Sequence, residues 1–245
     1  MTRSWLVTGG SRGIGRAVVD LVAAAGDCVA VLARSPVANG PAPPGQPGAG
    51  RVLAVKTDVT DPESVGDAVE TVREEFGSVD VVVNCAGVHR GGRVEQLSRE
   101  RWDEVVSTNL TGAFEVCRAA VPLLASGSAV VNVGAVVGLR GFPGDVAYGS
   151  AKAGLSGLTQ VLAVELAARG VRVNLVVPGF VDTEMTASLS DRARDRVVDA
   201  IPAGRVGTAT EIADVVVAVA GATYMTGATV PVDGGLMASF GGFAR

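Results

Sequence analysis

The sequence predicts an α/β protein in which a doubly wound parallel sheet lies between two layers of helices, a three-layer α/β/α domain. Three observations support this prediction. Short apolar runs alternate along the chain with segments of helical periodicity, as in repeated β-α units. A glycine-rich turn joins the first run to the first helical segment, which is typical of the nucleotide-binding Rossmann fold. The 245 residues, 48% of them apolar, suit one domain spanning 1–245.

The first predicted unit is a strand at residues 4–7, a glycine turn, and a helix that ends before Gly26. Glycines in the turn permit a tight bend, let a pyrophosphate approach the main chain, and let the helix pack closely on the strand. We therefore expect this turn to bind a dinucleotide. The predicted contacts are Gly9, Ser11, Arg12, Gly13, Ile14 and Gly15.

The second predicted strand, residues 28–33, is followed by Arg34, where an NAD-binding protein more often carries an acid for the ribose hydroxyls. Arg34 and Arg12 together are suited to the 2′-phosphate of NADPH. The alternative is that both arginines are merely solvated. Because the two positions converge on one ribose in this fold, we expect NADPH as the cofactor.

Residues 35–50 contain five prolines and four glycines and show no helical periodicity. We expect an extended loop here in place of the usual second crossover helix. A linker between two domains is the competing interpretation. It is rejected because two strands make only half of a nucleotide-binding unit and still need neighbours.

The third predicted strand, residues 52–55, leads into a short acidic segment. Asp58 is placed to accept a hydrogen bond from the adenine amino group, and Val59 belongs to the same predicted contact region. Thr60 or Asp61 is expected to cap the following helix, because a short side-chain oxygen can accept from the amides of the first turn.

The fourth predicted strand, residues 79–83, ends in small residues that let a flat nicotinamide ribose lie against the backbone. The expected contacts there are Asn84, Ala86 and Gly87. A predicted helix over residues 101–124 follows and carries Asn109. This residue is either a satisfied core amide or a polar member of the site.

A fifth strand, residues 128–133, precedes a predicted helix over residues 148–168 that carries Tyr148 and Lys152. Side chains four residues apart leave the same face of a helix. We expect the ammonium to lower the pKa of the phenol from about 10, toward the range useful for acid–base catalysis. An isolated pair with this spacing more often only packs or is solvated, so the other motifs give it meaning.

A sixth strand, residues 171–176, leads to Pro178 and Gly179, and the final strand covers residues 229–232. Between them, residues 186–205 are expected to form a polar, mobile lid. Such a segment suits a loop that closes over cofactor and substrate.

Composition excludes several functions. The net charge of −4 leaves no basic cluster for nucleic acid, and no apolar run is long enough to span a membrane. The N-terminus enters a strand without a signal peptide, and Cys28, Cys85 and Cys117 suggest reduced core thiols in a cytoplasmic protein. With His89 as the single histidine, a histidine metal site or a serine–histidine–aspartate triad is not expected.

Five motifs in order resemble the short-chain dehydrogenase/reductase family over the whole chain. They are Thr8-Gly-x-x-x-Gly-Ile-Gly15, Asn84-x-Ala-Gly87, Asn109, Tyr148-x-x-x-Lys152 and Pro178-Gly179. Residues 131–134, 177–185 and 205–207, with the closing Tyr-Met-Thr-Gly and Val-Asp-Gly-Gly, are most similar to 3-oxoacyl-[acyl-carrier-protein] reductases.

The resemblance implies a role for each matching residue. Tyr148 is the acid, Lys152 binds the nicotinamide ribose and tunes Tyr148, and Asn109 holds a water in a proton relay. Val181 and Thr183 touch the carboxamide and pyrophosphate, beside Pro178 and Gly179. It further implies NADPH as the cofactor and a homotetramer that pairs through the fourth and fifth helices and the final strand.

One position departs from the family. Thirteen residues before Tyr148 the family has a serine that steadies the substrate carbonyl, and this chain has Ala135. Loss of one such donor costs on the order of 10² to 10³ in rate. Three explanations remain open: an alanine introduced to trap a complex, a natural member with weak activity, or a member that binds cofactor without reducing a substrate. The first is favoured, because the other functional positions are intact.

Two functions therefore compete. The first is NADPH-dependent reduction of a 3-oxoacyl thioester in fatty-acid or polyketide synthesis, with a free small ketone as a variant. The second is an NADPH-binding scaffold or sensor in a homo-oligomer, supported only by Ala135. Arg169 matches one basic position expected to meet a carrier protein, whereas Ser126 stands where a second is often seen.

Overall fold

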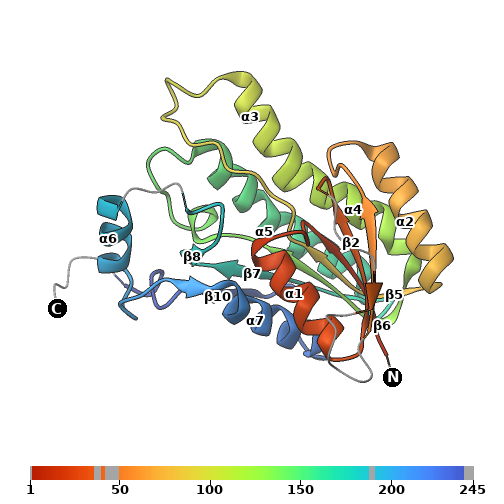
Figure 1. Ribbon diagram of the computed structural model, residues 1–245. Coiled ribbons are helices and arrows are strands. Elements are labelled where there is room, and N and C mark those ends of the chain that lie inside the picture. Colours follow the sequence, from red (N-terminus) through yellow and green to blue (C-terminus); the bar gives the residue numbers. More distant parts are fainter. Residues whose placement is uncertain (1, 36–39, 42–49, 188–190, 240–245) are drawn as a thin grey trace.

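The protein is built on a twisted parallel sheet (Figure 1). The computed structural model describes residues 2–35, 40–41, 50–187 and 191–239. Strand order across the sheet is β10-β7-β6-β5-β1-β2-β4, with β3 (Gly40–Pro41) antiparallel to β4 at one edge. The parallel strands are β1 (Ser4–Thr8), β2 (Cys28–Ala33), β4 (Arg51–Lys56), β5 (Val79–Asn84), β6 (Leu124–Val133), β7 (Arg172–Pro178) and β10 (Thr229–Val232).

Helices cover both faces of this sheet (Figure 1). One face packs against α1 (Gly13–Ala24) and α7 (Ala209–Gly221), and the other against α2 (Pro62–Phe76), α4 (Gly112–Ala120) and α5 (Val146–Ala167). The predicted doubly wound, three-layer architecture is thereby confirmed. None of the helices in the described ranges has the length and apolar character needed to cross a bilayer.

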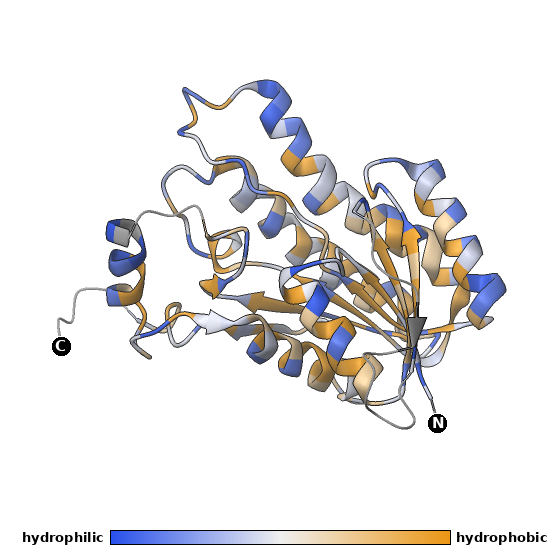
Figure 2. Ribbon diagram, viewed as in Figure 1, coloured by the Kyte–Doolittle hydropathy of each residue, from blue (hydrophilic) through white to orange (hydrophobic). Residues whose placement is uncertain are grey.

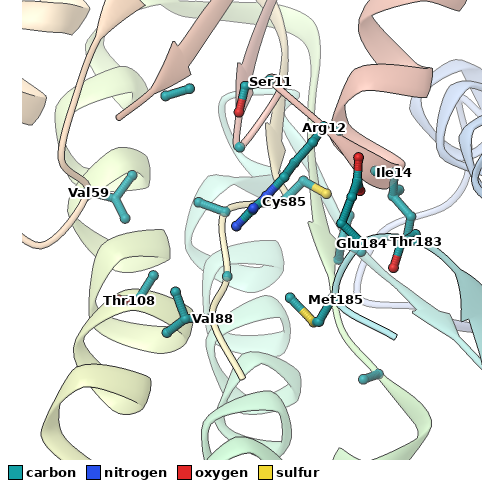
Figure 3. Close-up of a pocket in the computed structure, with 18 of the residues that line it drawn as sticks. Ser11, Arg12, Ile14, Val59, Cys85, Val88, Thr108, Thr183, Glu184 and Met185 are labelled. Carbon is teal, nitrogen blue, oxygen red and sulfur yellow. The ribbon is translucent and has the colours of Figure 1, made fainter. Parts of the chain in front are cut away.

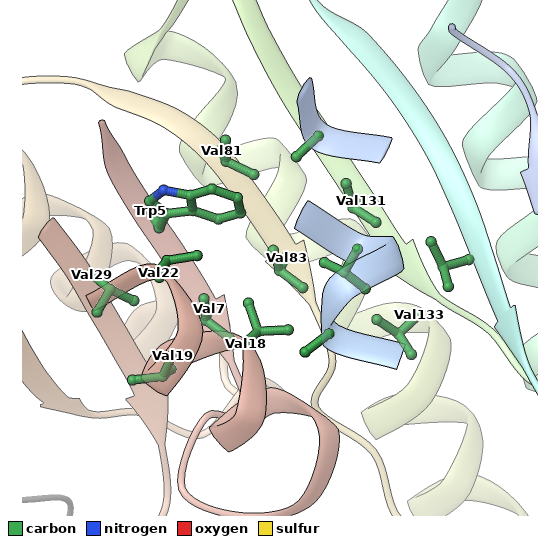
Figure 4. Packing of buried hydrophobic residues seen from close by; sticks show 14 of the residues in the cluster. Trp5, Val7, Val18, Val19, Val22, Val29, Val81, Val83, Val131 and Val133 are labelled. Atoms are coloured by element: carbon green, nitrogen blue, oxygen red, sulfur yellow. The ribbon is translucent and has the colours of Figure 1, made fainter. Parts of the chain in front are cut away.

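Apolar side chains alternate between the two faces along each central strand, so both sides of the sheet are buried. In β1, Trp5 and Val7 join the core under α1 and α7, whereas Leu6 joins the core under α2, α4 and α5. Figure 4 shows Trp5 surrounded by valines of the first core. Its indole Nε1 donates to Asp27 Oδ2 at 2.8 Å, so the buried indole N–H has a partner. Figure 2 shows the same strands as a hydrophobic layer.

The helix expected over residues 101–124 is interrupted. The structure has α3 (Arg99–Val106), a five-residue π-helix at Ser107–Thr111, then α4, then a 3₁₀ turn at Val121–Leu123. Strand β6 begins at Leu124, four residues before the expected start at residue 128. Pro122 lacks the N–H that an α-helix needs, which is consistent with the tighter turn there.

Two loop predictions have mixed outcomes. Within residues 35–50, Gly40–Pro41 forms the short β3, and residues 36–39 and 42–49 lie outside the described part. Within the expected lid, residues 186–205, the structure contains helix α6 (Asp191–Ala200), which projects away from the sheet (Figure 1). A small parallel pair, β8 (Val181–Asp182) with β9 (Gly207–Thr208), joins the two ends of that segment.

The topology creates a crevice where β1 and β5 lie side by side. Strand β1 pairs with β2 on one side and with β5 on the other. The loop after β1 leads to α1 on one face of the sheet, and the loop after β5 leads toward α4 on the other face. The two loops are in close contact, because a Cβ added to Gly9 would come within 2.8 Å of Ala86 Cα. In open parallel sheets, ligands bind outside the strand ends at such a switch point.

Candidate active site

A cleft runs along the carboxyl ends of the strands (Figure 3). It has two ends. The cofactor end is formed by the glycine turn with Arg12 and Arg34, and the catalytic end by Tyr148, Lys152 and Ala135, with Asn109 behind Gly87. The residues predicted from the sequence that line the cleft are Gly9, Ser11, Arg12, Gly13, Ile14, Gly15, Arg34, Asp58, Val59, Ala86, Gly87, Ala135, Tyr148, Lys152, Pro178, Gly179, Val181 and Thr183.

The glycine turn is shaped for the close approach of an anion. Gly9 and Gly13 have φ angles of 68° and 53°, in the left-handed region that favours glycine. A Cβ on Gly15 would lie 2.5 Å from Gly9 O, so the turn tolerates no side chain there. The N-cap residue of α1, Arg12, has no side-chain cap bond, and the first turn carries no acid. The first amides of α1 are therefore suited to a phosphate, and the turn fits a dinucleotide.

The arginines at the cofactor end are exposed and face the cleft. Arg12 extends from the glycine turn over the cleft (Figure 3). Neither Arg12 nor Arg34 forms an ion pair with a carboxylate of the described residues. Both guanidinium groups are available to a phosphate, which an arginine binds with two parallel hydrogen bonds.

Asp58 is held by its own loop. Its Oδ1 accepts from Thr60 N at 2.9 Å and from Thr60 Oγ1 at 2.7 Å. The backbone hydrogen bond from Thr60 is the main reason that the pKa of Asp58 is lowered, with a smaller contribution from the charge of Arg34. The cap of α2 is Asp61, which accepts from Glu63 N at 3.0 Å, so of the two expected caps only Asp61 has this role.

At the catalytic end, α5 places Tyr148 and Lys152 on one face. Lys152 is buried, and its Nζ donates to Val133 O at 2.8 Å and lies 5.7 Å from the centre of the Tyr148 ring. The expected lowering of the tyrosine pKa is wrong for this geometry. Burial raises the pKa of Tyr148 above its usual range, and Cys85 and Asp145 act in the same direction. Burial lowers the pKa of Lys152 to about 8.

The physical reason for this correction is desolvation. The Lys152 ammonium is shielded from water and donates to the carbonyl of Val133. Burial therefore destabilises the charged form of the lysine, and it destabilises a charged phenolate for the same reason. Tyr148 is therefore held as a neutral phenol. A neutral phenol at the end of a cleft can donate a proton.

Asn109 lies in the π-helix directly behind Gly87. Its Nδ2 donates to Val88 O at 2.8 Å and to Val105 O at 2.7 Å. Its Oδ1 is buried and has no hydrogen-bond partner among the described residues. A Cβ on Gly87 would lie 2.6 Å from this Oδ1 and 3.9 Å from Lys152 Nζ. The alternative of a satisfied core amide therefore holds for the nitrogen but not for the oxygen, which remains an open acceptor beside Lys152.

Comparisons with known proteins agree with this geometry. The family model described as enoyl-(acyl carrier protein) reductase matches residues 9–237. The chain belongs to the short-chain dehydrogenase/reductase family of oxidoreductases. The resemblance found in the sequence is confirmed.

Two curated relatives match nearly end to end. The 3-oxoacyl-[acyl-carrier-protein] reductase of Escherichia coli K12 is 41% identical over 239 residues, covering 94% of this chain and 96% of the relative. Carbonyl reductase family member 4 of Danio rerio is 41% identical over 237 residues, covering 96% and 98%.

Solved structures give the same result. A putative short-chain alcohol dehydrogenase from Sinorhizobium meliloti 1021 matches with a TM-score of 0.88 and 35% identity, covering 98% of each chain. A short-chain dehydrogenase/reductase, glucose/ribitol dehydrogenase, from Brucella melitensis matches with a TM-score of 0.86 and 29% identity, covering 96% of each chain.

Not every predicted contact of this short-chain dehydrogenase/reductase lies in the cleft. The Asn84 side chain is buried under it, and Nδ2 donates to Asn132 Oδ1 at 2.9 Å and to Cys117 Sγ at 3.2 Å. Asn132 in turn donates to Thr159 Oγ1 at 2.8 Å. The side chain of Asn84 thus joins β5 to β6 and α5, which corrects the expectation that it borders the cofactor.

Other residues line the cleft without having been predicted. Cys85 and Thr108 do so, as does Met185 from the segment after β7 (Figure 3). Cys85 read from the sequence as a core thiol, and burial raises its pKa to about 11, with the charge of Lys152 opposing the rise. The sequence signal that places Cys85 at the cleft is its position directly before Ala86, which was predicted to line it.

Ala135 lies at the catalytic end, after β6. It precedes a short 3₁₀ turn at Val136–Gly138 and presents a methyl group to the cleft. Ser150, on the exposed side of α5, borders a neighbouring groove and not this cleft, so it supplies no hydroxyl to the catalytic end. The site therefore combines a neutral phenol with a dinucleotide-shaped cleft and presents a methyl group, and no hydrogen-bond donor, at position 135.

Proposed function

We propose that this short-chain dehydrogenase/reductase reduces the ketone of a 3-oxoacyl thioester with NADPH. The observation that carries the proposal is the neutral, partly buried phenol of Tyr148 beside Lys152, at the end of a cleft whose glycine turn fits a dinucleotide. The 41% identity with a 3-oxoacyl-[acyl-carrier-protein] reductase supports the substrate class. A 3-oxoacyl thioester of a carrier protein, of coenzyme A or of a simpler thiol presents the same ketone to the site.

NADPH is favoured over NADH by charge. Arg12 and Arg34 both line the cofactor end, and the sequence after β2 offers no acid to bind the ribose hydroxyls. A 2′-phosphate would find two guanidinium groups there. An acidic residue in place of Arg34 would repel the 2′-phosphate.

In the proposed reaction, the nicotinamide supplies a hydride to the ketone carbon. Tyr148 gives its hydroxyl proton to the ketone oxygen, so that the C=O bond becomes a C–H and an O–H bond. Lys152 would hold the nicotinamide ribose by donating hydrogen bonds to its hydroxyls. The open Oδ1 of Asn109 would hold a water next to Lys152, through which the tyrosine regains a proton.

Ala135 makes the protein, as it stands, an impaired reductase in this proposal. Without a hydroxyl at this position the developing negative charge on the substrate oxygen has one donor fewer, which corresponds to a loss on the order of 10² to 10³ in rate. A scaffold or sensor that binds NADPH with little turnover is the second candidate, and Ala135 is the observation that favours it.

The test is NADPH consumption with an acetoacetyl thioester, comparing the protein with an Ala135→Ser variant. A rate increase of orders of magnitude in the serine variant supports the reductase and the thioester class. If neither protein turns over although both bind NADPH, the thioester proposal fails, and a scaffold or a reductase of another small ketone takes its place.

A homotetramer is part of the proposal. Phe114 on α4 and Val161 and Val164 on α5 are large apolar side chains exposed by 44%, 55% and 79%. Contact with a second copy of the chain would remove them from water. Arg169 is a weaker candidate for carrier contact than the sequence suggested, because its Nη2 donates to Val121 O and Leu124 O.

The proposed location is the cytoplasm. Cys28, Cys85 and Cys117 are free thiols in the structure. Reduced thiols are the usual state in a reducing compartment.

A further inference from the structure

Ionisable side chains also lie beside the catalytic end, outside the machinery described above. His89, the only histidine of the chain, places Nε2 2.7 Å from Oδ1 of Asp145. Its ring meets the ring of Tyr148 edge-on, with centroids 5.1 Å apart and planes at 85°. One imidazole therefore contacts both a carboxylate and the ring of the proposed proton donor. The carboxylate can only accept, so Nε2 carries a proton and donates to it.

Asp145 is fixed in position for this contact. It is the N-cap residue of α5, yet its side chain makes no bond to the helix amides, which an aspartate at this position ordinarily does. Its backbone carbonyl accepts from Gly149 N at 2.7 Å. The loop that carries His89 is joined to the same segment, because Gly92 N donates to Gly144 O at 2.8 Å. The Asp145 carboxylate, 16% exposed, thus faces His89.

The other charges around the pair are compensated or constant. Arg90 donates to the carbonyl of His89 through Nη1, but its Nε and Nη2 bind the carboxylate of Glu104 on α3. Tyr148 is faced by Lys152, by Cys85 and by Asp145. Of these, the Asp145 carboxylate is the negative charge whose field a protonated His89 would offset.

We propose that His89 and Asp145 are positioning residues for Tyr148: they hold its ring at the catalytic end and make its proton donation depend on the charge state of His89. This inference rests on the proposed role of Tyr148 as the proton donor. Imidazole is the side chain that ordinarily changes charge between about pH 5 and 8. A protonated His89 offsets the Asp145 carboxylate and makes the phenol a better acid, and a neutral His89 leaves the carboxylate uncompensated.

The first experiment needs no turnover. Tyr148 and Tyr224 are the only two tyrosines, and Tyr224 is fully exposed, so a Tyr224→Phe protein labelled with ¹³C-tyrosine gives one tyrosine signal by NMR. We expect the Tyr148 signal to move in one step between about pH 5 and 8. The step should be absent in His89→Gln, which keeps a donor to Asp145 without titrating. In Asp145→Asn, which keeps an acceptor and a good N-cap residue without the charge, the step should move to lower pH, because no carboxylate then stabilises the imidazolium.

The second experiment is kinetic and uses the Ala135→Ser protein as the parent. The ratio of kcat in the parent to kcat in its His89→Gln variant should rise about threefold from pH 8 to pH 6, with KM for NADPH unchanged. His89→Ala should lower kcat at every pH, and glutamine should restore the alkaline value. A positional effect without titration would instead give a constant ratio.

The outcomes separate this inference from the proposed function. A Tyr148 signal that stays flat between about pH 5 and 8 overturns the inference, whether or not the protein turns over a substrate. A clear step without any turnover by the Ala135→Ser parent supports the pair and contradicts the proposed reaction. A step whose midpoint is unchanged in Asp145→Asn also overturns the inference, because the Asp145 charge would then play no part.

Discussion

The two ends of the cleft are built from different parts of the chain. At the cofactor end, main-chain geometry forms the surface: Gly9 and Gly13 adopt left-handed conformations, and Gly15 lies against Gly9 O. At the catalytic end, side chains form the site, and the chemistry of Tyr148 and Lys152 is set by burial. A binding surface formed by the main chain either has room for a ligand or excludes it. The pKa of a buried ionisable side chain, by contrast, changes with each neighbouring charge or hydrogen bond.

The largest expected effect is at the catalytic end. Replacement Tyr148→Phe in the Ala135→Ser protein removes the proton donor and should lower kcat by about 10³. Binding of NADPH should stay within about threefold, because a phenyl ring keeps the packing. Steady-state kinetics and fluorescence titration measure the two quantities. Tyr224→Phe, at an exposed position, is the matched control and should leave both unchanged. Equal losses in kcat and NADPH affinity would contradict the separation of the two ends.

The next effect tests the missing donor. Ala135→Ser should raise kcat by about 10² to 10³, because a hydroxyl then stabilises the developing charge on the substrate oxygen. Ala135→Gly is the control, since it changes the side chain without adding a donor. An increase with glycine as large as with serine would show that space, and not hydrogen bonding, limits the rate.

Burial of Lys152 predicts a pH dependence of stability. Its pKa of about 8 lies below the unfolded value of 10.5, so the unfolded chain binds more protons between these values. Stability from this group is therefore present above pH 10.5 and is lost as the pH falls through 8. Relative to Lys152→Met, the free energy of unfolding should rise by about 3 kcal/mol across that window. Urea unfolding at each pH measures it, and a constant difference would contradict the desolvated lysine.

At the cofactor end, Gly9→Ala should weaken NADPH binding about a hundredfold, because its Cβ meets the Ala86 backbone and its φ is left-handed. Gly66→Ala, in the middle of α2 with open space around it, is the matched control. It should leave binding unchanged and stabilise the fold by about 0.5 to 1 kcal/mol. Normal binding by Gly9→Ala would show that the turn can shift to admit a side chain.

The smallest effect concerns cofactor choice. Arg34→Ala should weaken NADPH binding about tenfold and leave NADH binding nearly unchanged, because only NADPH carries the 2′-phosphate. Arg51→Ala, at an exposed arginine paired with Glu75 on α2, is the control. If both cofactors weaken equally in Arg34→Ala, the arginine supports the loop and does not select NADPH.

The same contrast explains how far the sequence could be interpreted. Glycines at fixed spacing and apolar alternation are local patterns, so the parallel sheet and the cleft beside Gly9 followed from them, whereas helix α7 was not predicted. Asn84 shows the limit: its motif predicted the strand end correctly, but its amide turns inward to Asn132, 48 residues away. The contact between His89 and Asp145 joins positions 56 residues apart, and no local pattern indicates it.

Electrostatics was harder still to predict. The four-residue spacing of Tyr148 and Lys152 placed them on one face as expected, but spacing does not show how far the two side chains are exposed to solvent. Burial reverses the expected direction of the tyrosine pKa, and burial depends on β6 and on Cys85 from another strand end. The break in the helix over residues 101–124 likewise depends on Asn109 finding Val88 O and Val105 O.

The π-helix at Ser107–Thr111 determines where Asn109 lies between α3 and α4. A π-helical turn holds one residue more than an α-helical turn, so deleting one residue here would convert the segment into ordinary α-helix. Asn109 would then leave its place behind Gly87, where a Cβ added to the glycine would lie 2.6 Å from Asn109 Oδ1. The length of this segment is therefore under as strict a constraint as its composition. Substitutions at its surface should be tolerated far better than any one-residue deletion.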